Sequence, residues 1–256
     1  MELGLFFFAV ILGATGLGVF LGRRVRHLSE SLKEPFGVLQ GALLGVVGLL
    51  LAFGLSLAVS RYEDRRSNIV SEANAIGTTY LRAQTLAEPI RSRSLALLIR
   101  YTQSAIRVSD EVPGSTDAAD ARDAEERIQR QLWSLAGKAL ETAPVASAPR
   151  LYVETLNEMF DGETARVAAL SNRVPTAVLV LEVLGSAIAL GLLATYLAIV
   201  GRGVFAVLLA SILVAFLLLV TADLDRPTRG MIQVPDTTLK DQLESMQEPP
   251  AAAAPR

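Results

Sequence analysis

Four long apolar blocks set the hydropathy pattern of the chain. They cover residues 3–22, 36–60, 177–200 and 204–222. Each block is long enough to cross a bilayer as a helix, because a spanning helix needs about 20 predominantly apolar residues. The second block contains no charged residue, and the third contains a single acid, Glu182. We therefore predict four transmembrane helices.

The lengths of the connections indicate how these spans pair. Only residues 201–203 separate the last two blocks, so a tight antiparallel hairpin is expected there. Residues 23–35 connect the first two blocks and are short enough to make a second hairpin. The sequence thus predicts one transmembrane hairpin within residues 1–60 and another within residues 175–222.

The first block has two interpretations, a retained anchor or a cleaved signal peptide. A signal peptide starts with a basic segment and ends at a cleavage site of small residues. This chain starts with Met1-Glu2, and its first basic residues, Arg23 and Arg24, follow the apolar block. This order favours a retained anchor.

The stretch between the hairpins, residues 61–174, has the periodicity of amphipathic helices. Its apolar residues recur at steps of three and four, which places them on one narrow helix face. Breaks are expected at Pro89, residues 112–116 and residues 144–149. We expect about four soluble helices, the first continuous with span two and the last with span three. The apolar series are Ile69, Ala73, Ile76, Tyr80 and Ala83; Leu98, Tyr101 and Ala105; Ile128, Leu132, Leu135 and Ala139; and Leu156, Met159 or Phe160, Val167 and Leu170.

The fold class that follows is all-α, because no stretch alternates apolar and polar residues as a strand does. The tail, residues 223–256, is polar and becomes low in complexity at Pro249-Pro250 and residues 251–254. Such a composition cannot form a packed core, so we expect the end of the tail to be disordered.

The side of the membrane that holds residues 61–174 stays open. Connectivity puts this insert on the same side as both chain ends, opposite residues 23–35 and Arg202. Basic residues mark the cytoplasmic side of a membrane protein, yet here they flank the spans on both sides. They are Arg23, Arg24, Arg26 and Lys33 on the short-loop side, and Arg61, Arg65, Arg66, Arg226 and Arg229 on the insert side.

Composition excludes several kinds of chemistry. The chain has 256 residues, 51% hydrophobic and 20% charged, and its mean hydropathy of +0.41 reflects segregation of the apolar residues into blocks. The absence of cysteine excludes disulfides, thiolate metal sites and a cysteine nucleophile. His27 is the only histidine, which argues against histidine metal centres and a Ser-His-Asp triad. The net charge of −2 gives no reason to expect a nucleic-acid partner.

The charged residues of the insert indicate no catalytic site. The insert has 15 basic and 16 acidic residues, interspersed as on solvated helix faces. No nucleophile and base stand out among them. We therefore expect no enzymatic activity, no cofactor and no metal.

Glycines recur at near-helical spacing in the first two blocks. In lipid, small residues let helices approach closely, as in the G-x-x-x-G motif. Two interpretations stay open, namely packing between spans of one chain and contact between subunits of an oligomer. The glycines are Gly13, Gly16, Gly18 and Gly22 in the first block and Gly41, Gly45 and Gly48 in the second.

The acid in the third block, Glu182, lies seven residues beyond Pro175, which is about 10 Å along a helix. A carboxylate within a membrane span is a functional candidate, as an ion or proton site. A structural acid that is hydrogen-bonded or reaches the interface fits the sequence equally well.

Charged residues cluster where the second and fourth spans end, on the same side of the membrane. Opposite charges there are expected to pair, for example Arg61 with Asp223. Such a collar either locks the helices together or concentrates ions at a pore mouth, since rings of charge set selectivity in pores. Its two acids are too few for a calcium cage, which needs about six to eight oxygens. The collar comprises Arg61, Arg65, Arg66, Asp223, Asp225 and Arg226.

The end of the second block, residues 51–63, resembles the end of the second transmembrane helix of bestrophins, which are anion channels. The whole chain resembles more closely the bestrophin-like domain family of uncharacterised, mostly bacterial integral membrane proteins. This resemblance covers nearly residues 1–245. It rests on residues 61–66 (RYEDRR), 72–82 (EANAIGTTYLR), 224–230 (LDRPTRG) and 232–234 (IQV).

The resemblance to bestrophins implies a five-subunit ring with a narrow neck lined by the second span. The matching positions, which step every four residues, are Phe53, Leu49 and Gly45, although Gly45 is too small to form a constriction. Tyr62-Glu63 replaces a Trp-Trp pair, and the acidic run of the calcium-gated members is absent, so calcium gating is not expected. The resemblance also implies a cytoplasmic insert, opposite to the side favoured by the short-loop charges.

Two functions follow as alternatives. The first is a homo-oligomeric, bestrophin-like channel that passes small anions through an apolar gate at Phe53 and Leu49. The second is a non-conducting membrane scaffold or sensor whose helical insert binds a partner. Both make the chain a multi-pass protein of the bacterial inner membrane, with the lipid bilayer and further copies of itself as expected partners.

Overall fold

The described part of the chain comprises most of its length. The computed structural model describes residues 2–25, 33–201, 203–226, 228 and 230–248. The expectations for Arg26, Arg202, Arg229 and the low-complexity end of the tail lie outside the described residues.

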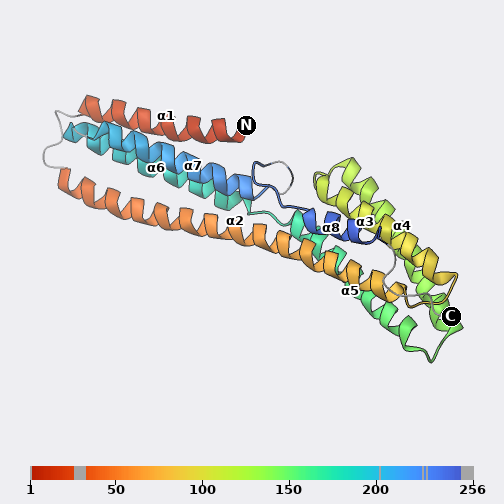
Figure 1. Ribbon diagram of the computed structural model, residues 1–256. Helices are drawn as coiled ribbons and strands as arrows, with labels where there is room; N and C mark the ends of the chain where they lie inside the picture. The colour runs from red at the N-terminus through yellow and green to blue at the C-terminus, as the bar shows by residue number, and fades with distance from the viewer. Residues whose placement is uncertain (1, 26–32, 202, 227, 229, 249–256) are drawn as a thin grey trace. The chain divides into compact units, whose positions relative to one another are not determined.

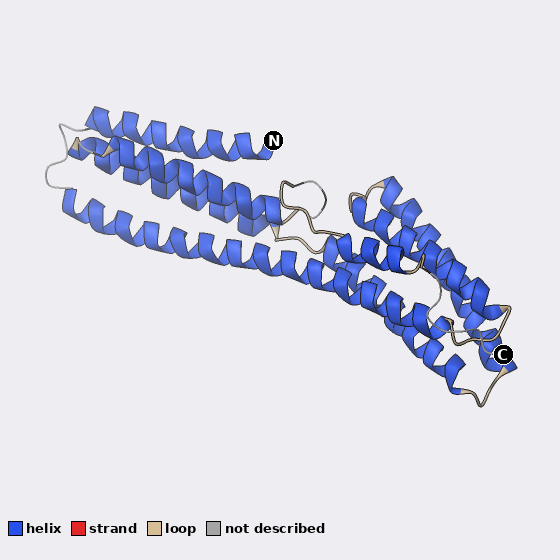
Figure 2. Ribbon diagram, viewed as in Figure 1, coloured by secondary structure: helices blue, strands red, loops and turns tan. Residues whose placement is uncertain are grey.

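All regular secondary structure in these residues is helical (Figures 1 and 2). This confirms the all-α class predicted from the periodicity. The helices are α1 (Glu2–Val25), α2 (Lys33–Ala83), α3 (Ile90–Asp110), α4 (Thr116–Thr142), α5 (Ser147–Ser171), α6 (Thr176–Val200), α7 (Val204–Leu224) and α8 (Thr237–Ser245).

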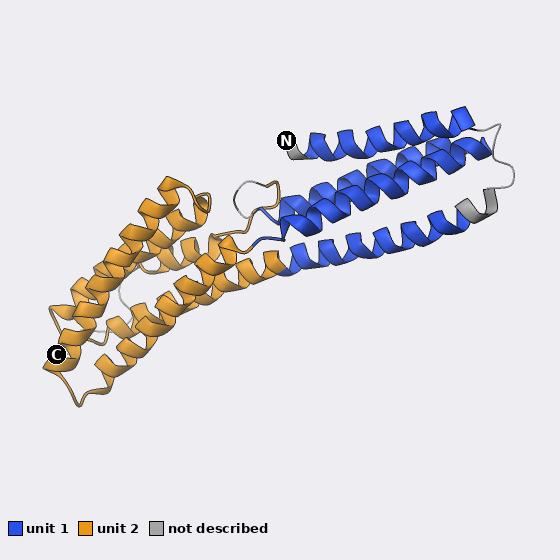
Figure 3. Ribbon diagram, turned by 180° about the vertical axis from the view of Figure 1, so that it is seen from behind, with its two compact units in different colours: residues 1–60, 173–226 blue, residues 61–172, 227–256 orange. Residues whose placement is uncertain are grey.

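Residue contacts divide the chain into two compact units (Figure 3). Unit 1 comprises residues 1–60 and 173–226, and unit 2 comprises residues 61–172 and 227–256. Unit 1 therefore contains α1, the first part of α2, α6 and α7. Unit 2 contains the rest of α2 together with α3, α4, α5 and α8.

Unit 1 is built from helices with the length and composition of membrane spans. In the described chain, the stretches long and apolar enough to cross a membrane lie within Gly4–Val25, Gly37–Ala83, Ser147–Val200 and Val204–Leu224. Helix α1 packs against α6 and α7, and α6 packs against α7. The pairing of all four spans as two hairpins stays a prediction, since these contacts join α1 to α6 and α7.

Glycines allow close backbone contacts in unit 1. A Cβ at Gly18 of α1 would collide with the backbone oxygen of Gly191 in α6, and a Cβ at Gly22 would collide with the α6 backbone one turn further along. Packing within the chain is therefore the role of these two glycines. Gly201 and Gly203, with φ of 81° and 85°, occupy the left-handed region that favours glycine and form the short turn between α6 and α7.

Unit 2 buries the amphipathic faces of its helices in one core. Helix α3 packs against α4, α4 against α5, and α8 against α3. The predicted apolar series supply most of this core, including Ile76 of α2, Tyr101 of α3, Leu132 of α4 and Leu156 of α5. Removal of apolar surface from water, at roughly 25 cal/mol per Å², stabilises the arrangement.

The helix of span two continues beyond the span, whereas the chain is not helical directly before span three. Helix α2 runs from Lys33 to Ala83 without a break, as predicted. The predicted continuity of the last soluble helix with span three is wrong, because α5 ends at Ser171 and α6 begins at Thr176. Pro175 lies in the gap, and a proline disfavours helical backbone at the residue before it.

Candidate functional site

One face of α2 is buried within unit 1. Between Gly41 and Ser60 its buried residues are Val47, Leu51, Gly54 and Ala58. Steps of four, three and four residues place them on the same side of the helix. Helix α6 covers this side, since a Cβ at Gly185 would lie 3.4 Å from the Val47 side chain.

The three pore candidates lie on the opposite, exposed face of α2. The side chains of Phe53 and Leu49 are 64% and 56% exposed. Gly45 is also exposed, and a Cβ at this position would meet no atom within 4 Å. Between Gly37 and Ser60 the helix carries no ionisable side chain. The exposed face is therefore uncharged over the whole span.

The glycines of α2 do not pack within the chain. A Cβ at Gly41, Gly45 or Gly48 would meet no atom within 4 Å. For these three residues, the interpretation as packing between spans of one chain is wrong, because no neighbouring helix approaches them. Contact with another subunit stays a prediction for this part of α2.

Glu182 of α6 is buried against α2. Its side chain is 2% exposed, and neither carboxyl oxygen has a hydrogen-bond partner. The carboxyl group occupies the space next to Gly54, where a Cβ would collide with Oε1. The glycine thus makes room for the acid. This geometry differs from that of a hydrogen-bonded acid and from that of an acid reaching towards solvent.

Two buried hydroxyls in unit 1, on α1 and α7, are hydrogen-bonded. The hydroxyls of Thr15 in α1 and Ser211 in α7 lie 2.7 Å apart and share a hydrogen bond. Each also lies 2.8 Å from a backbone oxygen one turn earlier in its own helix. Because a hydroxyl has a single proton, one of the two donates to the other hydroxyl and the second donates to its own helix backbone. In α6, by contrast, Ser186 lies one turn beyond Glu182, and its buried hydroxyl has no hydrogen-bond partner. Glu182 and Ser186, one turn apart on α6, are therefore both buried without a hydrogen-bond partner.

The residues of the predicted charge collar are divided between the two units. In unit 1, the collar residue Asp225 makes a hydrogen bond that stabilises the fold. Asp225 is buried, and its Oδ1 accepts a hydrogen bond of 2.7 Å from the backbone N–H of Val174. This bond stabilises the non-helical connection before α6, where a helical partner for that N–H is lacking. Asp223 is half-buried, and Arg226 is exposed.

In unit 2, Arg65 of the collar is buried, and its side chain binds the C-terminal end of α5. Its Nε donates to the backbone oxygen of Ala169, 3.2 Å away, and a terminal nitrogen donates to that of Asn172, 2.8 Å away. Both carbonyl groups lie at the C-terminal end of α5, where the last backbone acceptors lack a full set of helical donors. Arg66 forms an exposed pair of 4.0 Å with Glu63. The pairing of Arg61 with Asp223 stays a prediction, because the two residues belong to different units.

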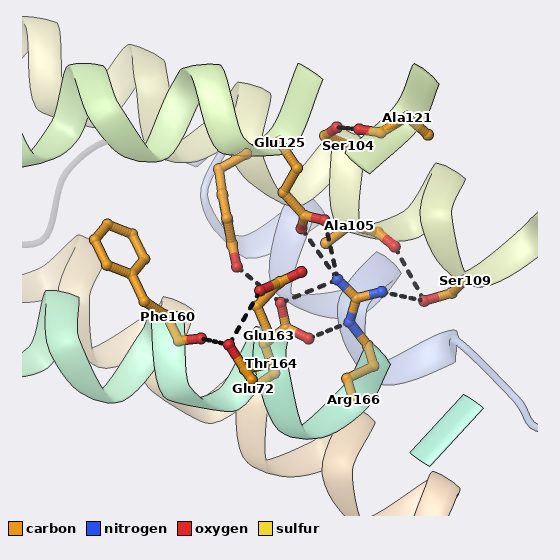
Figure 4. Close-up of polar contacts among 11 residues, drawn as sticks. Glu72, Ser104, Ala105, Ser109, Ala121, Glu125, Phe160, Glu163, Thr164 and Arg166 are labelled. Carbon is orange, nitrogen blue, oxygen red and sulfur yellow. Dashed lines mark hydrogen bonds and ion pairs between the residues drawn. The ribbon is translucent and has the colours of Figure 1, made fainter. Parts of the chain in front are cut away.

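A buried ionic network connects four helices of unit 2 (Figure 4). The Arg166 guanidinium from α5 forms an ion pair with Glu72 of α2 and another of 3.0 Å with Glu125 of α4. The phenol of Tyr101 in α3 donates a hydrogen bond of 3.0 Å to Glu72. All four side chains are buried. Charge-assisted bonds of this kind fix the helices in one arrangement, provided each charge keeps its partner.

The network holds two carboxyl groups and one guanidinium. Burial raises the pKa of Glu125 to about 8, Arg166 opposes this rise, and the neighbouring Glu72 adds to it. Burial also raises the pKa of Tyr101 well above its ordinary value of 10.0, so its phenol stays a donor. One guanidinium thus serves two carboxyl groups, so burial favours the protonated form of Glu125 more than it does for an exposed acid.

The expectation that the charges of the insert lie on solvated faces is wrong for Glu72, Glu125 and Arg166. The sequence did contain a signal. Glu125 precedes Ile128 by three residues, so it continues the apolar series of α4 towards its N-terminus. Arg166 precedes Leu170 by four residues in the same way. A charge in register with an apolar series predicts burial and a partner.

An exposed groove between α3 and α4 is strongly basic. It has a volume of about 650 Å³. Four of its lining residues are cations and none is an acid: Arg93, Arg127, Arg130 and Lys138. In the described residues, no group of three or more acids or histidines is placed to hold a metal ion.

One family model matches most of the chain. The model of the family described as Bestrophin-like domain matches residues 7–239. No curated protein matches the chain.

Solved structures with the same fold come from bacterial bestrophin homologues. The crystal structure of a homologue from Klebsiella pneumoniae is 17% identical, covers 93% of this chain and 100% of its own, and has a TM-score of 0.67. A single-residue variant from the same organism is 16% identical over 94% of this chain and 98% of its own, with a TM-score of 0.70. At these identities the likeness shows the fold.

Proposed function

The chain belongs to the Bestrophin-like domain family, and from this premise we propose that it forms a homo-oligomeric ring in the bacterial inner membrane and conducts small anions. Helix α2 of each subunit lines the pore, with Leu49 and Phe53 at the narrowest part. The proposal takes anion conduction from the resemblance to bestrophins and the placing of the pore from the geometry of α2.

The observation that carries the proposal is the division of α2 into two faces. One face is buried against α6, and the other exposes Phe53 and Leu49 along an uncharged span. In a ring of subunits, such a face turned towards a common axis forms an apolar constriction. A constriction of this kind excludes ions when it is dry and passes them when it is wetted.

The glycines of α2 support the oligomer. Gly41, Gly45 and Gly48 have open space at their Cβ positions, so a helix from another subunit can approach the backbone closely there. In lipid, such small surfaces favour helix association through van der Waals packing. A head-to-tail arrangement of identical subunits closes into a ring when the rotation permits.

Chloride efflux from liposomes tests the pore assignment. Phe53→Ala widens the proposed constriction and is expected to increase efflux by about tenfold, the factor that corresponds to ~1.4 kcal/mol at the gate. The matched control is Phe20→Ala, since Phe20 is 58% exposed on α1 and lies outside the proposed pore. Equal efflux from the Phe53 variant and the wild type rules out the gate.

The basic groove of unit 2 favours the second candidate function, a scaffold or sensor. Four cations without an acid in one groove form a surface for an acidic partner. Under this alternative the wild-type protein conducts nothing, and Arg127→Glu with Arg130→Glu abolishes capture of the partner. Efflux that responds to Phe53→Ala excludes this alternative as the sole function.

A further inference from the structure

Glu182 is the acid in unit 1 that the anion pathway leaves unexplained. Its carboxyl group is 2% exposed, has no hydrogen-bond partner on either oxygen, and lies in the space left by Gly54. A carboxylate ion without partners in apolar surroundings is strongly disfavoured, whereas the neutral acid costs far less to bury. The packing seen at Gly54 is therefore that of the protonated acid.

No neighbouring charge compensates an ionised Glu182. The apolar parts of α1, α2 and α7, over residues 4–22, 37–60 and 204–222, contain no ionisable side chain. In α6 itself, Tyr196 lies fourteen residues further on, where its ring faces Gly37. The other charged residues in the described part of unit 1 lie near the ends of its helices or outside them: Glu2, Arg23, Arg24, Lys33, Glu34, Arg173, Asp223, Asp225 and Arg226.

The ligand that fits this position is a proton. A metal ion of the calcium type needs about six to eight oxygens, and the unbonded side-chain oxygens here are those of Glu182 and Ser186. A single proton needs only the carboxyl group. When it leaves, the ion must gain water or a new partner, and both require α2 to move away from α6.

The position of Gly54 connects this proton to the exposed face of α2. Phe53 directly precedes Gly54 and lies on the opposite, exposed face of the same helix. We propose that Glu182 is a proton-binding site inside the membrane span, and that loss of its proton loosens the contact with Gly54 and changes the pore face at Phe53. The second part rests on the proposed function; the first does not.

Two measurements on the same samples test the proposal. Infrared spectra of the protein in lipid, from about pH 5.5 to about pH 8.5, follow protonated carboxyl groups. The wild-type minus Glu182→Gln difference is expected to contain one carboxylic acid band that disappears as the pH rises. Glu125, whose pKa burial raises to about 8, contributes equally to both spectra and cancels.

Chloride efflux over the same pH range is the second measurement. Wild-type efflux is expected to change by about tenfold, and efflux from Glu182→Gln to be independent of pH. Glu182→Asp keeps an ionisable carboxyl group and should keep the pH dependence, which separates titration from a change in packing. The control is Glu158→Gln, an exposed acid of α5, which should behave as the wild type.

The outcomes separate this proposal from the proposed function. A difference spectrum without a pH-dependent acid band overturns the proton site. An acid band that titrates, together with pH-dependent efflux that persists in Glu182→Gln, overturns the connection to the pore. If the band titrates and no variant conducts at any pH, the proton site stands and the anion channel is rejected. Should Glu182→Gln not fold, the wild-type minus Glu182→Ala difference supplies the same band test, because alanine also lacks a carboxyl group.

Discussion

Arg166 of α5 and Glu72 of α2 form a fully buried ion pair across 94 positions of sequence. The same guanidinium also binds Glu125 of α4. One cation therefore determines how three helices of unit 2 pack around a common polar centre. Because this centre is removed from water, each of its charges depends on the others.

Replacement of the central cation tests this dependence. Arg166→Met leaves Glu72 and Glu125 buried without a counter-charge, and breaking a buried pair in this way costs about 3–5 kcal/mol. We expect a large fall in the thermal unfolding midpoint of the solubilised protein. Arg130→Met is the matched control, because the pair of Arg130 with Glu126 is exposed and such pairs contribute little. Equal melting of the two variants would contradict the structural role of Arg166.

The pH dependence of stability follows from Glu125. Burial raises its pKa from the ordinary 4.5 to about 8. Between these values the folded protein holds a proton that the unfolded chain has released, so the free energy of unfolding falls as the pH rises. This contribution is fully present below the lower value and is lost as the pH passes about 8.

Thermal melts of wild type and Glu125→Gln at a series of pH values check this sign. The glutamine cannot ionise, so the fall in melting temperature between acidic and alkaline pH should be smaller in this variant. Glu126→Gln, at the exposed neighbouring position, should follow the wild type. Parallel curves for wild type and Glu125→Gln would show that Glu125 does not hold the proton.

Gly18 of α1 and Gly48 of α2 are expected to respond differently to the same substitution. Gly48→Leu adds a side chain where a Cβ has no neighbour within 4 Å, so the subunit should fold but associate less. Gly18→Leu forces a side chain into the backbone of α6 and should destabilise the fold itself. Native mass and thermal melting of both variants in detergent distinguish the two effects. Full assembly of the Gly48→Leu protein would contradict the proposed contact between subunits at α2.

The connection before α6 gives a test within the predicted collar. Asp225→Ala removes the acceptor for the buried N–H of Val174, and an unsatisfied buried donor costs about 1–3 kcal/mol. Asp225→Asn retains an oxygen acceptor and should lose less stability. Thermal melting ranks the two variants, and equal losses would mean that the charge of Asp225 matters more than this hydrogen bond.

Long apolar blocks made the spans of unit 1 predictable. The block at residues 204–222 corresponds to α7, Val204–Leu224, and the block at 177–200 to α6, Thr176–Val200. Their length and composition suffice, because a helix is the structure that satisfies its own backbone in lipid. The break before α6 was harder to predict, since periodicity continues on both sides of it and Pro175 alone marks its position.

The rest of the candidate site depends on contacts between segments that are far apart in the sequence. That Glu182 faces Gly54 depends on which side of α6 meets α2, and neither hydropathy nor spacing contains this information. The buried network depends likewise on four helices meeting at Arg166. The exposure of Phe53 and Leu49 agrees with the spacing of four residues, but their role in a pore stays a prediction.

Current through a planar bilayer containing the wild-type protein tests whether the chain forms an anion-conducting ring. With unequal chloride concentrations on the two sides, we expect a current whose reversal potential lies near the chloride equilibrium potential. A reversal potential at the cation equilibrium value, or no current above that of the protein-free bilayer, would contradict an anion-conducting ring.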